Sequence, residues 1–454
     1  MSSIDEIRAA RLAKLDLLKE QGINPYPATT SRDTTVADAI EKFEEGKNVI
    51  LAGRILSLRA QGKIVFLDIS DGTGRFQALL KSGEPLPEKN FELFEKAFDI
   101  GDFIEVRGTL FITKKGQKTV LAEEVKMLSK SLLPLPEKWH GLQDVEERFR
   151  KRYLDILSNP EIKDLFIKKA KFWDATRNFM KKEGFLEVET PTLEVTTGGA
   201  EARPFKTHHN DFDMDVFMRI SIGELWQKRL MAAGFEKTFE IGRAYRNEGS
   251  SPEHTQEFTN LEFYWGYAGY KAGMDLVKRM YREIAQEVFG TTQFTTKGYT
   301  FDLGDEWPEI DYVAEIKQQT GLDVTDSDEE DMKDKLDELG VKYEGTNKER
   351  LTDSLWKYCR KNISGPAFLV NHPTLVGPLA KLNESGKTVQ MFQPIIAGSE
   401  VGRGYSELND PLDQKARFEV QQKLIEGGDE EAMMPDWEFV EMLEYGMPPT
   451  SGFG

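Results

Sequence analysis

Residues 239–264 read FEIGRAYRNEGSSPEHTQEFTNLEFY, and this stretch decides how the rest of the chain is interpreted. Two runs of alternating apolar and polar residues, 238–245 and 257–264, flank a segment rich in Gly, Ser, Pro and charge. Such alternation on both sides of turn-forming residues is typical of paired strands. The stretch therefore predicts a β-hairpin with a long loop.

Charge is concentrated on this hairpin. In the alternating register, Arg246 and Glu248 would share one face with Glu240. One face of the return strand would carry Phe258, Glu262 and Tyr264. An Arg, several carboxylates and an aromatic ring suit a small zwitterion beside a phosphate and a flat base. The alternative from these residues alone is an amphipathic hairpin with a solvated polar face.

The order F-x-I-G-R-x-Y-R-N-E-G, followed by His254 and then by E-F-T at 257–259, resembles the motif 2 hairpin of class II aminoacyl-tRNA synthetases, the lysyl branch in particular. A later run, S-E-L-N-D-P-L-D-Q at 406–414, is typical of the same branch. The resemblance covers almost the whole chain. It favours the ligand-binding interpretation of the hairpin over the solvated one.

Composition is that of a soluble globular protein of two or three domains, with 454 residues, 39% hydrophobic and 30% charged. No apolar run approaches the ~18 residues of a membrane span, and the N-terminus lacks the apolar region of a signal peptide. Cys359 is the only cysteine, which suits a reducing compartment. We expect a cytoplasmic protein. The adjacent His208 and His209 lack further ligands at zinc spacing and do not indicate a metal site.

The formal charge of −18 by itself argues against nucleic acid as a partner. Its distribution matters more, because residues 48–131 predict five strands and one short helix (90–97), typical of an OB-type barrel. Basic side chains cluster on or beside these strands, with Phe66 and Phe76 among them: Arg54, Arg59, Lys63, Arg75, Lys114, Lys115 and Lys118. The alternative is that Phe66 is core and the lysines are solvated.

The arrangement R-x-x-x-K-x-x-F followed by G-R-F-Q resembles the anticodon-binding barrel of lysyl-tRNA synthetases. By that resemblance Phe66 would stack on an anticodon base. Base edges would be read by Arg59, Gln77 and Glu124. The resemblance thus implies tRNA(Lys) as a partner.

The whole chain divides into four predicted parts: a helical extension (1–47), the OB-fold domain (48–131), a linker (132–160) and a class II catalytic domain (161–454) with a helical insertion at about 305–365. The fold class is α+β, and the resemblance implies a six-stranded antiparallel catalytic sheet flanked by helices. A helix over 162–183 and the following E-T-P-T resemble motif 1, which implies a homodimer with Pro191 at the centre of its interface.

The reaction implied by the resemblance is that of a lysine–tRNA ligase: lysine and ATP give lysyl-adenylate, and lysine then passes to its tRNA. The implied catalytic residues are Arg246, Glu248 and His254. Arg246 would hold the amino-acid carboxylate and the α-phosphate, Glu248 would contact the adenine end, and His254 would approach the triphosphate. Phe258 would stack on the adenine, and Arg403 would complete the ATP site.

Lysine would be recognised at its two amines. By the same resemblance Glu224 and the backbone of Gly199 would take the α-amino group. The ε-ammonium would be surrounded by Glu262, Tyr264 and Glu407. A side chain without the second amine would leave these carboxylates desolvated and unpaired, which discriminates strongly.

Magnesium is the implied cofactor, with Glu400 as its ligand and Gln393 and Glu407 as weaker candidates. The chain departs from the family pattern here, with Gln393 in place of a carboxylate and Arg403 in place of an Asn. In the hairpin loop, Glu253 stands where the family carries an Arg. We expect these departures to alter the metal geometry and not to abolish function.

The final run GMPPTSGFG (446–454) resembles the lead-in to motif 3, whose Arg grips the γ-phosphate. That Arg would lie beyond Gly454. Two alternatives therefore stay open beside the ligase: a catalytically impaired dimeric tRNA-binding paralogue, and a paralogue that lysylates protein. Paralogues of the second kind lack the barrel, so residues 48–130 count against it.

Overall fold

The computed structural model describes residues 4–136, 142–200, 202–251, 254–343, 345, 347–428 and 432–454. Within it the chain forms two compact units, Met1–Leu165 and Phe166–Gly454. The helix α6 (Pro160–Lys182) contains the boundary between them. None of the helices in the described ranges is long and apolar enough to cross a membrane.

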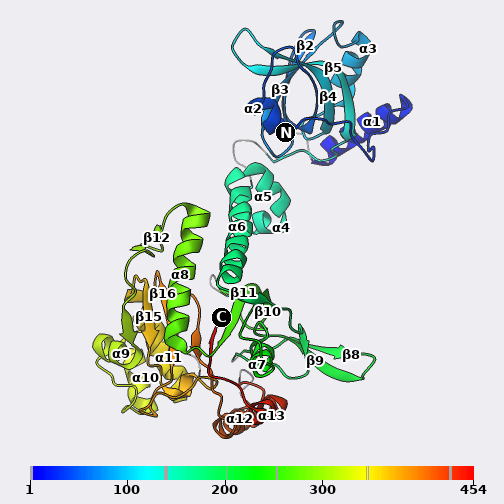
Figure 1. Ribbon diagram of the computed structural model, residues 1–454. Coiled ribbons are helices and arrows are strands. Elements are labelled where there is room, and N and C mark those ends of the chain that lie inside the picture. Colours follow the sequence, from blue (N-terminus) through cyan, green and yellow to red (C-terminus); the bar gives the residue numbers. More distant parts are fainter. Residues whose placement is uncertain are drawn as a thin grey trace. The chain divides into compact units, whose positions relative to one another are not determined.

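The first unit is a barrel with helices around it (Figure 1). Before α6, the elements of this unit are α1 (Ile4–Glu20), α2 (Val36–Glu41), β1 (Asn48–Gln61), β2 (Ile64–Ser70), β3 (Arg75–Lys81), α3 (Glu88–Ala97), β4 (Phe103–Ile112), β5 (Lys118–Ser129), α4 (Val145–Arg150) and α5 (Arg152–Ser158).

The barrel closes in the order β1-β2-β3-β5-β4. Alternate residues of β2 and β3 are buried, so that Leu67, Ile69 and Phe76 fill the interior. Phe76 is only 3% exposed. The expectation that Phe76 contributes to a stacking surface is therefore wrong, because its position in the alternation points it inward.

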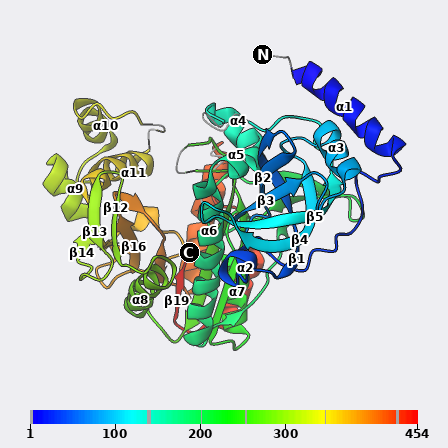
Figure 2. The same cartoon turned by 90° about the horizontal axis from the view of Figure 1, so that it is seen from above.

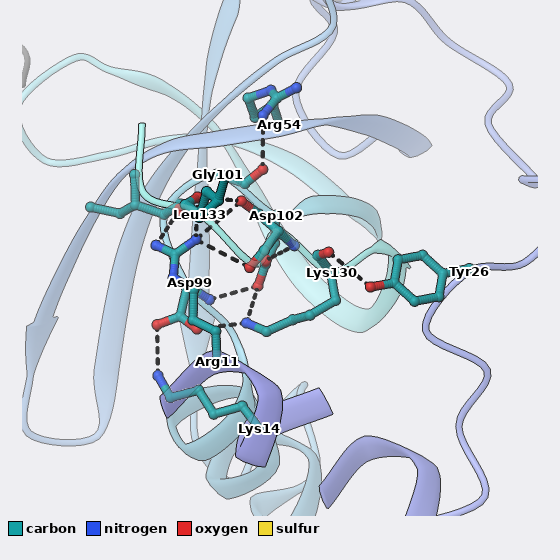
Figure 3. Close-up of polar contacts among 11 residues, drawn as sticks. Arg11, Lys14, Tyr26, Arg54, Asp99, Gly101, Asp102, Lys130 and Leu133 are labelled. Carbon is teal, nitrogen blue, oxygen red and sulfur yellow. Dashed lines mark hydrogen bonds and ion pairs between the residues drawn. The ribbon is translucent and has the colours of Figure 1, made fainter. Parts of the chain in front are cut away.

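The N-terminal helix α1 lies against the outside of the barrel beside α3 (Figure 2). Arg11, 8% exposed, donates to the carbonyls of Ile100, Ser131 and Leu133. Close by, the fully buried Lys130 donates to Asp102 at 2.9 Å and to Asp99 at 2.6 Å (Figure 3). Lys130 is thus buried but paired with carboxylates, and Arg11 joins α1 to the segments that flank β4 and follow β5.

The second unit is built on a large sheet. The strands of this unit are β6 (Leu186–Glu187), β7 (Leu193–Glu194), β8 (Lys206–His209), β9 (Met214–Met218), β10 (Lys237–Tyr245), β11 (Glu257–Gly266), β12 (Gln293–Thr296), β13 (Tyr299–Asp302), β14 (Glu309–Asp311), β15 (Ala367–Val370), β16 (Met391–Ile396), β17 (Ser399–Glu400), β18 (Gly404–Ser406) and β19 (Thr450–Phe453). Of these, β7, β8 and β9 form a separate small sheet, and β12 and β13 form another. Its helices are α7 (Glu224–Ala232), α8 (Tyr270–Phe289), α9 (Tyr312–Thr320), α10 (Glu329–Glu338), α11 (Lys348–Cys359), α12 (Pro411–Glu426) and α13 (Trp437–Tyr445), with the short 3₁₀ turns η1 (Arg360–Asn362) and η2 (Thr374–Val376).

The main sheet has the order β14-β15-β16-β18-β19-β11-β10-β6, with β17 paired to β16. The six strands from β15 to β10 are all antiparallel. Both outer strands, β14 and β6, are parallel to their neighbours. The expected six-stranded antiparallel sheet is thus the centre of a larger mixed sheet, because edge strands of two or three residues carry too little alternation to be predicted.

Helix α8 covers one face of this sheet and packs on β16, β18 and β19 (Figure 1). The shared core contains Phe263, Phe392 and Phe453, each at most 5% exposed. The helices α9, α10 and α11 pack around Trp356 in a core that also includes Leu369 of β15 and Ile395 of β16. The candidate site lies on the other face of the sheet.

Candidate functional site

A cavity of about 550 Å³ opens on the second unit. It is lined by residues from far apart in the sequence: Gly199, Glu224, Arg246, His254, Phe258, Glu262, Tyr264, Gln393, Glu400, Arg403 and Glu407. All of these were candidates from the sequence. Of the ligand-contacting candidates in the catalytic domain, only Glu248 is not part of the lining.

The hairpin β10–β11 forms the floor of the cavity. Its register pairs Ala244 with Phe258, Gly242 with Asn260 and Glu240 with Glu262. Alternate residues of β11 therefore share one face, which carries Phe258, Asn260, Glu262 and Tyr264 into the cavity. The predicted face of the return strand is present as expected.

Glu240 does not belong to this site. Its carboxylate is 4% exposed and lies 2.6 Å from the Arg219 guanidinium, and it also accepts hydrogen bonds from the backbone and hydroxyl of Thr190. The register pairs Glu240 with Glu262, so Glu240 does lie on the expected face, but its carboxylate is engaged by Arg219 and Thr190 and does not line the cavity. A buried carboxylate with this many partners is a structural ion pair.

Arg246 follows β10 directly and is held by a hydrogen bond from Nε to the Ile220 carbonyl at 3.2 Å. Its guanidinium lies 5.2 Å from the centre of the Phe258 ring. Burial lowers the pKa of Arg246, and the carboxylates of Glu248 and Glu262 offset part of that effect. A partly desolvated guanidinium beside an aromatic face can bind carboxylate or phosphate oxygens in pairs.

The loop of the hairpin carries two further candidates. Glu248 accepts a hydrogen bond from the Arg203 amide at 3.3 Å, and His254 lies 2.7 Å from the Ser251 hydroxyl through Nδ1. His254 is exposed and lines the cavity. Glu253, the departure from the family pattern, lies outside the described residues.

Glu224 is the first residue of α7, where a carboxylate is favoured by the helix dipole. Its side chain is 5% exposed and faces Gly199, whose φ is +89°. A Cβ at Gly199 would lie 2.7 Å from Glu224 Oε2 and 2.5 Å from Ser221 Oγ. Only glycine leaves room here, which exposes the backbone beside the carboxylate.

Glu262 is held from two sides. It accepts a hydrogen bond from the Ile222 amide at 2.7 Å and another from the Tyr264 hydroxyl at 3.2 Å. Its side chain is 5% exposed. Burial and then repulsion from Glu224 raise the pKa of Glu262 to about 7. The empty site therefore holds this carboxyl partly protonated near neutral pH.

Glu407 follows β18 and is 2% exposed. Its Oε1 is buried and has no hydrogen-bond partner within the described part of the chain. A Cβ on Gly452 would lie 2.0 Å from that same oxygen. Burial raises the pKa of Glu407 to about 8, against the opposing attraction of Lys228. An orphaned buried carboxylate oxygen in a cavity is a site for a cationic ligand.

Lys228 is a functional candidate that the sequence reasoning missed. It is 1% exposed, and its Nζ lies 2.7 Å from Glu224 Oε1 and 2.5 Å from Glu407 Oε2. Tyr405, also missed, donates from its hydroxyl to Glu224. The spacing of Glu224 and Lys228, four residues apart on one helix, was the available signal for their ion pair.

Glu400 lies on β17 and is exposed. Its two oxygens accept hydrogen bonds from Trp356 Nε1 at 2.6 Å and from Gln393 Nε2 at 3.2 Å. Gln393 Oε1 faces His372 Nε2 at 2.8 Å. Burial lowers the pKa of His372 to about 3, so that the ring is neutral.

Arg403 lines the cavity with an exposed side chain. Its backbone pairs with that of Gly454 at 2.7 and 2.9 Å. Among the described residues its guanidinium makes no hydrogen bond or ion pair, which leaves it available to an anion.

The predicted base-reading residues lie in the first unit. Arg59 is opposite Phe66 in the β1–β2 register, and Gln77 on β3 accepts a hydrogen bond from Thr119 at 3.0 Å. The structure therefore brings Arg59 and Phe66 together on neighbouring strands.

Glu124 stands apart from them. It lies five residues along β5 from Thr119, or about 17 Å of extended strand. Its carboxylate is within 3.5 Å of Arg107 and 3.4 Å of Lys126. The ion pairs of Glu124 are thus with Arg107 and Lys126 and not with Arg59, the basic candidate for base reading.

The chain combines an OB barrel with a mixed sheet whose centre is antiparallel. One cavity of the second unit carries an Arg, an aromatic ring and several carboxylates. These features together point to one class of enzyme. The family described as tRNA synthetases class II (D, K and N) matches residues 144–454, and the OB-fold nucleic acid binding domain matches residues 49–128. The chain belongs to the class II tRNA synthetases.

Within that class, the chain is similar to curated lysine–tRNA ligases. Proteins named lysine–tRNA ligase from Thermotoga maritima, Pelotomaculum thermopropionicum and Moorella thermoacetica are 41%, 43% and 43% identical to this chain. Each alignment covers 99% of this chain and 90–93% of the relative. The OB-barrel and α+β fold class expected from the sequence is thereby confirmed.

Proposed function

We propose that this protein is a lysine–tRNA ligase, which activates lysine with ATP and transfers it to tRNA(Lys). The observation that carries the proposal is the group of three buried carboxylates, Glu224, Glu262 and Glu407, at one cavity. Buried carboxylates require cationic partners. Lysine has two ammonium groups, and amino acids with one would leave a carboxylate unpaired. The names of the relatives support the same substrate.

In the first step, a carboxylate oxygen of lysine attacks the α-phosphorus of ATP, and the bond from that phosphorus to the bridging oxygen breaks to release pyrophosphate. Arg246 would hold both reacting groups, since its planar guanidinium matches pairs of oxygens. Phe258 would stack on the adenine, and His254 and Arg403 would lie along the phosphates. No covalent bond to the protein is needed, so catalysis rests on positioning and charge neutralisation.

In the second step, a terminal ribose hydroxyl of the tRNA attacks the carbonyl carbon of lysyl-adenylate, and AMP leaves. The barrel would bind the anticodon, with Phe66 stacking on a base and Arg59 beside it. A family match over residues 49–128 supports a nucleic-acid partner for this domain. It also counts against the protein-lysylating alternative, in which the barrel is expected to be absent.

Magnesium fits the site through Glu400. Mg²⁺ is commonly held by one or two carboxylates together with substrate phosphates and water, and Glu400 offers an exposed carboxylate at the cavity. Bound there with ATP, the ion would neutralise phosphate charge. Gln393 would act by holding Glu400 through its amide. Glu407 does not suit a metal, because Lys228 already lies 2.5 Å from it.

Lysine-dependent exchange of pyrophosphate into ATP tests the first step without tRNA. We expect exchange with lysine and none above background with asparagine or aspartate. Exchange with aspartate or asparagine alone would contradict the substrate. Binding of tRNA(Lys) without any exchange would favour the impaired tRNA-binding paralogue.

A further inference from the structure

Three of the carboxylates that line the cavity are grouped near one buried lysine side chain. Glu224, Glu262, Glu407 and Lys228 are 5%, 5%, 2% and 1% exposed. Lys228 Nζ touches Glu224 Oε1 and Glu407 Oε2 but makes no ion pair with Glu262. Burial would lower the pKa of Lys228, but the two carboxylates outweigh it and raise that pKa. Lys228 is therefore a permanent cation of the protein.

The charges do not balance without a ligand. If all three carboxylates were ionised, the one ammonium would leave two negative charges in a buried region, which is costly. Without a ligand this cost appears as the raised pKa of Glu262 and of Glu407. The orphaned Glu407 Oε1 lies on the side of that carboxylate not taken by Lys228. A ligand with two ammonium groups would bring the sum to zero.

We propose that Lys228 sets the charge of this amino-acid site: it neutralises one of the three buried carboxylates and leaves two, the number that matches a diamino acid. This inference rests on the proposed function and adds a specificity residue to it. Lys228 acts through Glu224 and Glu407, so it is a positioning residue and does not need to touch the substrate.

Other charged and titratable groups that face these carboxylates do not change the count. The charge of Arg246 lowers the pKa of Glu262. In the complex, the carboxylate of the substrate would pair with Arg246, so the two charges cancel. The hydroxyls of Tyr264 and Tyr405 are neutral, since burial raises the pKa of both. Glu194 is close enough to Glu262 to be affected by it, and burial raises the pKa of Glu194 to about 8. Unlike Glu407, it makes no ion pair with Lys228, so it is left out of the count. Arg403, on the outer lining, acts on Tyr405.

Lys228→Met tests the charge, because methionine fills similar space without it. In the full chain, calorimetry should show lysine binding weakened at least about tenfold. Without Lys228 nothing opposes the raised pKa of Glu407, so this carboxyl should stay protonated and no longer require a second ammonium. The preference for lysine over norleucine, which lacks the second amine, should therefore also fall. Lys228→Arg, which keeps a cation, should retain more of that preference. ATP affinity without lysine should stay within about twofold, as a check that the fold is intact.

Lys228→Ala with added amine separates charge from packing. Ethylammonium should restore lysine affinity to this variant, whereas ethanol, which fills space without charge, should not. Unchanged lysine affinity in Lys228→Met, or equal rescue by ethanol and ethylammonium, would overturn the proposal. If the wild-type chain itself fails to bind lysine, the proposed function fails and not only the role of Lys228.

Discussion

At the scale of single residues, a change at Glu262 should distinguish lysine binding from ATP binding. It contacts the Ile222 amide and the Tyr264 hydroxyl at the inner end of the cavity, whereas the proposed ATP contacts are Arg246, Phe258 and the loop. Glu262→Gln should therefore weaken lysine binding at least about tenfold and leave ATP binding within about twofold. Calorimetry with each substrate alone measures both.

The matched control is Glu257→Gln. Glu257 is on the same strand but exposed, and its ion pair with Arg243 at 2.6 Å lies at the surface, where such pairs contribute little. This variant should bind both substrates normally. Equal losses of lysine and ATP affinity in Glu262→Gln would contradict the assignment of Glu262 to the amino acid.

The same carboxylates predict how lysine binding depends on pH. Burial raises the pKa of Glu262 to about 7 and of Glu407 to about 8, so the empty site holds protons near neutrality. Ammonium groups favour the ionised carboxylates, and lysine entry must release those protons. Lysine affinity should thus rise from pH 6 to pH 8. Calorimetry in two buffers of different ionisation enthalpy should show proton release near pH 7, and proton uptake would contradict the prediction.

At the scale of elements, Arg11 makes several of the hydrogen bonds that hold helix α1 to the barrel. Arg11 donates to three carbonyls and to the Ser131 hydroxyl, and removing it breaks these partly buried hydrogen bonds. Arg11→Ala should lower the free energy of unfolding of the barrel unit by about 2 kcal/mol. Arg8→Ala, at an exposed position of the same helix, should change it by less than about 0.5 kcal/mol. Chemical denaturation measures both, and equal effects would argue against docking through Arg11.

A change in the barrel strands should impair the transfer of lysine to tRNA and not the activation of lysine. Phe66 is half-buried on β2 with Arg59 opposite it, and base stacking on an aromatic contributes about 1–3 kcal/mol. Phe66→Ala should lower kcat/KM for tRNA lysylation about tenfold and leave pyrophosphate exchange unchanged. Ile112→Ala, at a 45% exposed apolar residue of β4, serves as control. Normal lysylation by Phe66→Ala would defeat the anticodon role.

Sequence reasoning succeeded where side chains repeat regularly. Alternation along β10 and β11 predicted which residues of the hairpin share the cavity, and Phe258, Glu262 and Tyr264 do. It failed where partners come from distant segments. Nothing local shows that Lys228 meets Glu407, or that Trp356 in the insertion donates to Glu400. Parity alone also could not tell that Phe76 faces inward, since either face of a strand can be the core.

At the scale of the whole molecule, the second unit combines its site from segments about 250 residues apart. Gly199 and Glu224 precede the hairpin, and Glu407 and Gly452 come from near the end of the described chain. The central antiparallel strands bring them together, because β19 pairs with both β11 and β18. The site therefore depends on the complete sheet, and local unfolding of β19 would remove contacts to Glu407 and Tyr264 together.

Exposed apolar side chains near Pro191 in the sequence predict self-association. Leu186, Leu193 and Val195 are 50%, 52% and 62% exposed, and they flank Pro191, where motif 1 would place the centre of a dimer. We expect a dimer in sedimentation velocity at micromolar concentration. Because each apolar side chain buried in a two-fold interface counts twice, Leu193→Asp with Val195→Asp should raise the dimer dissociation constant at least about 100-fold. Leu412→Asp, at a 75% exposed leucine on α12, should leave it unchanged, and a monomeric wild-type chain would contradict the prediction.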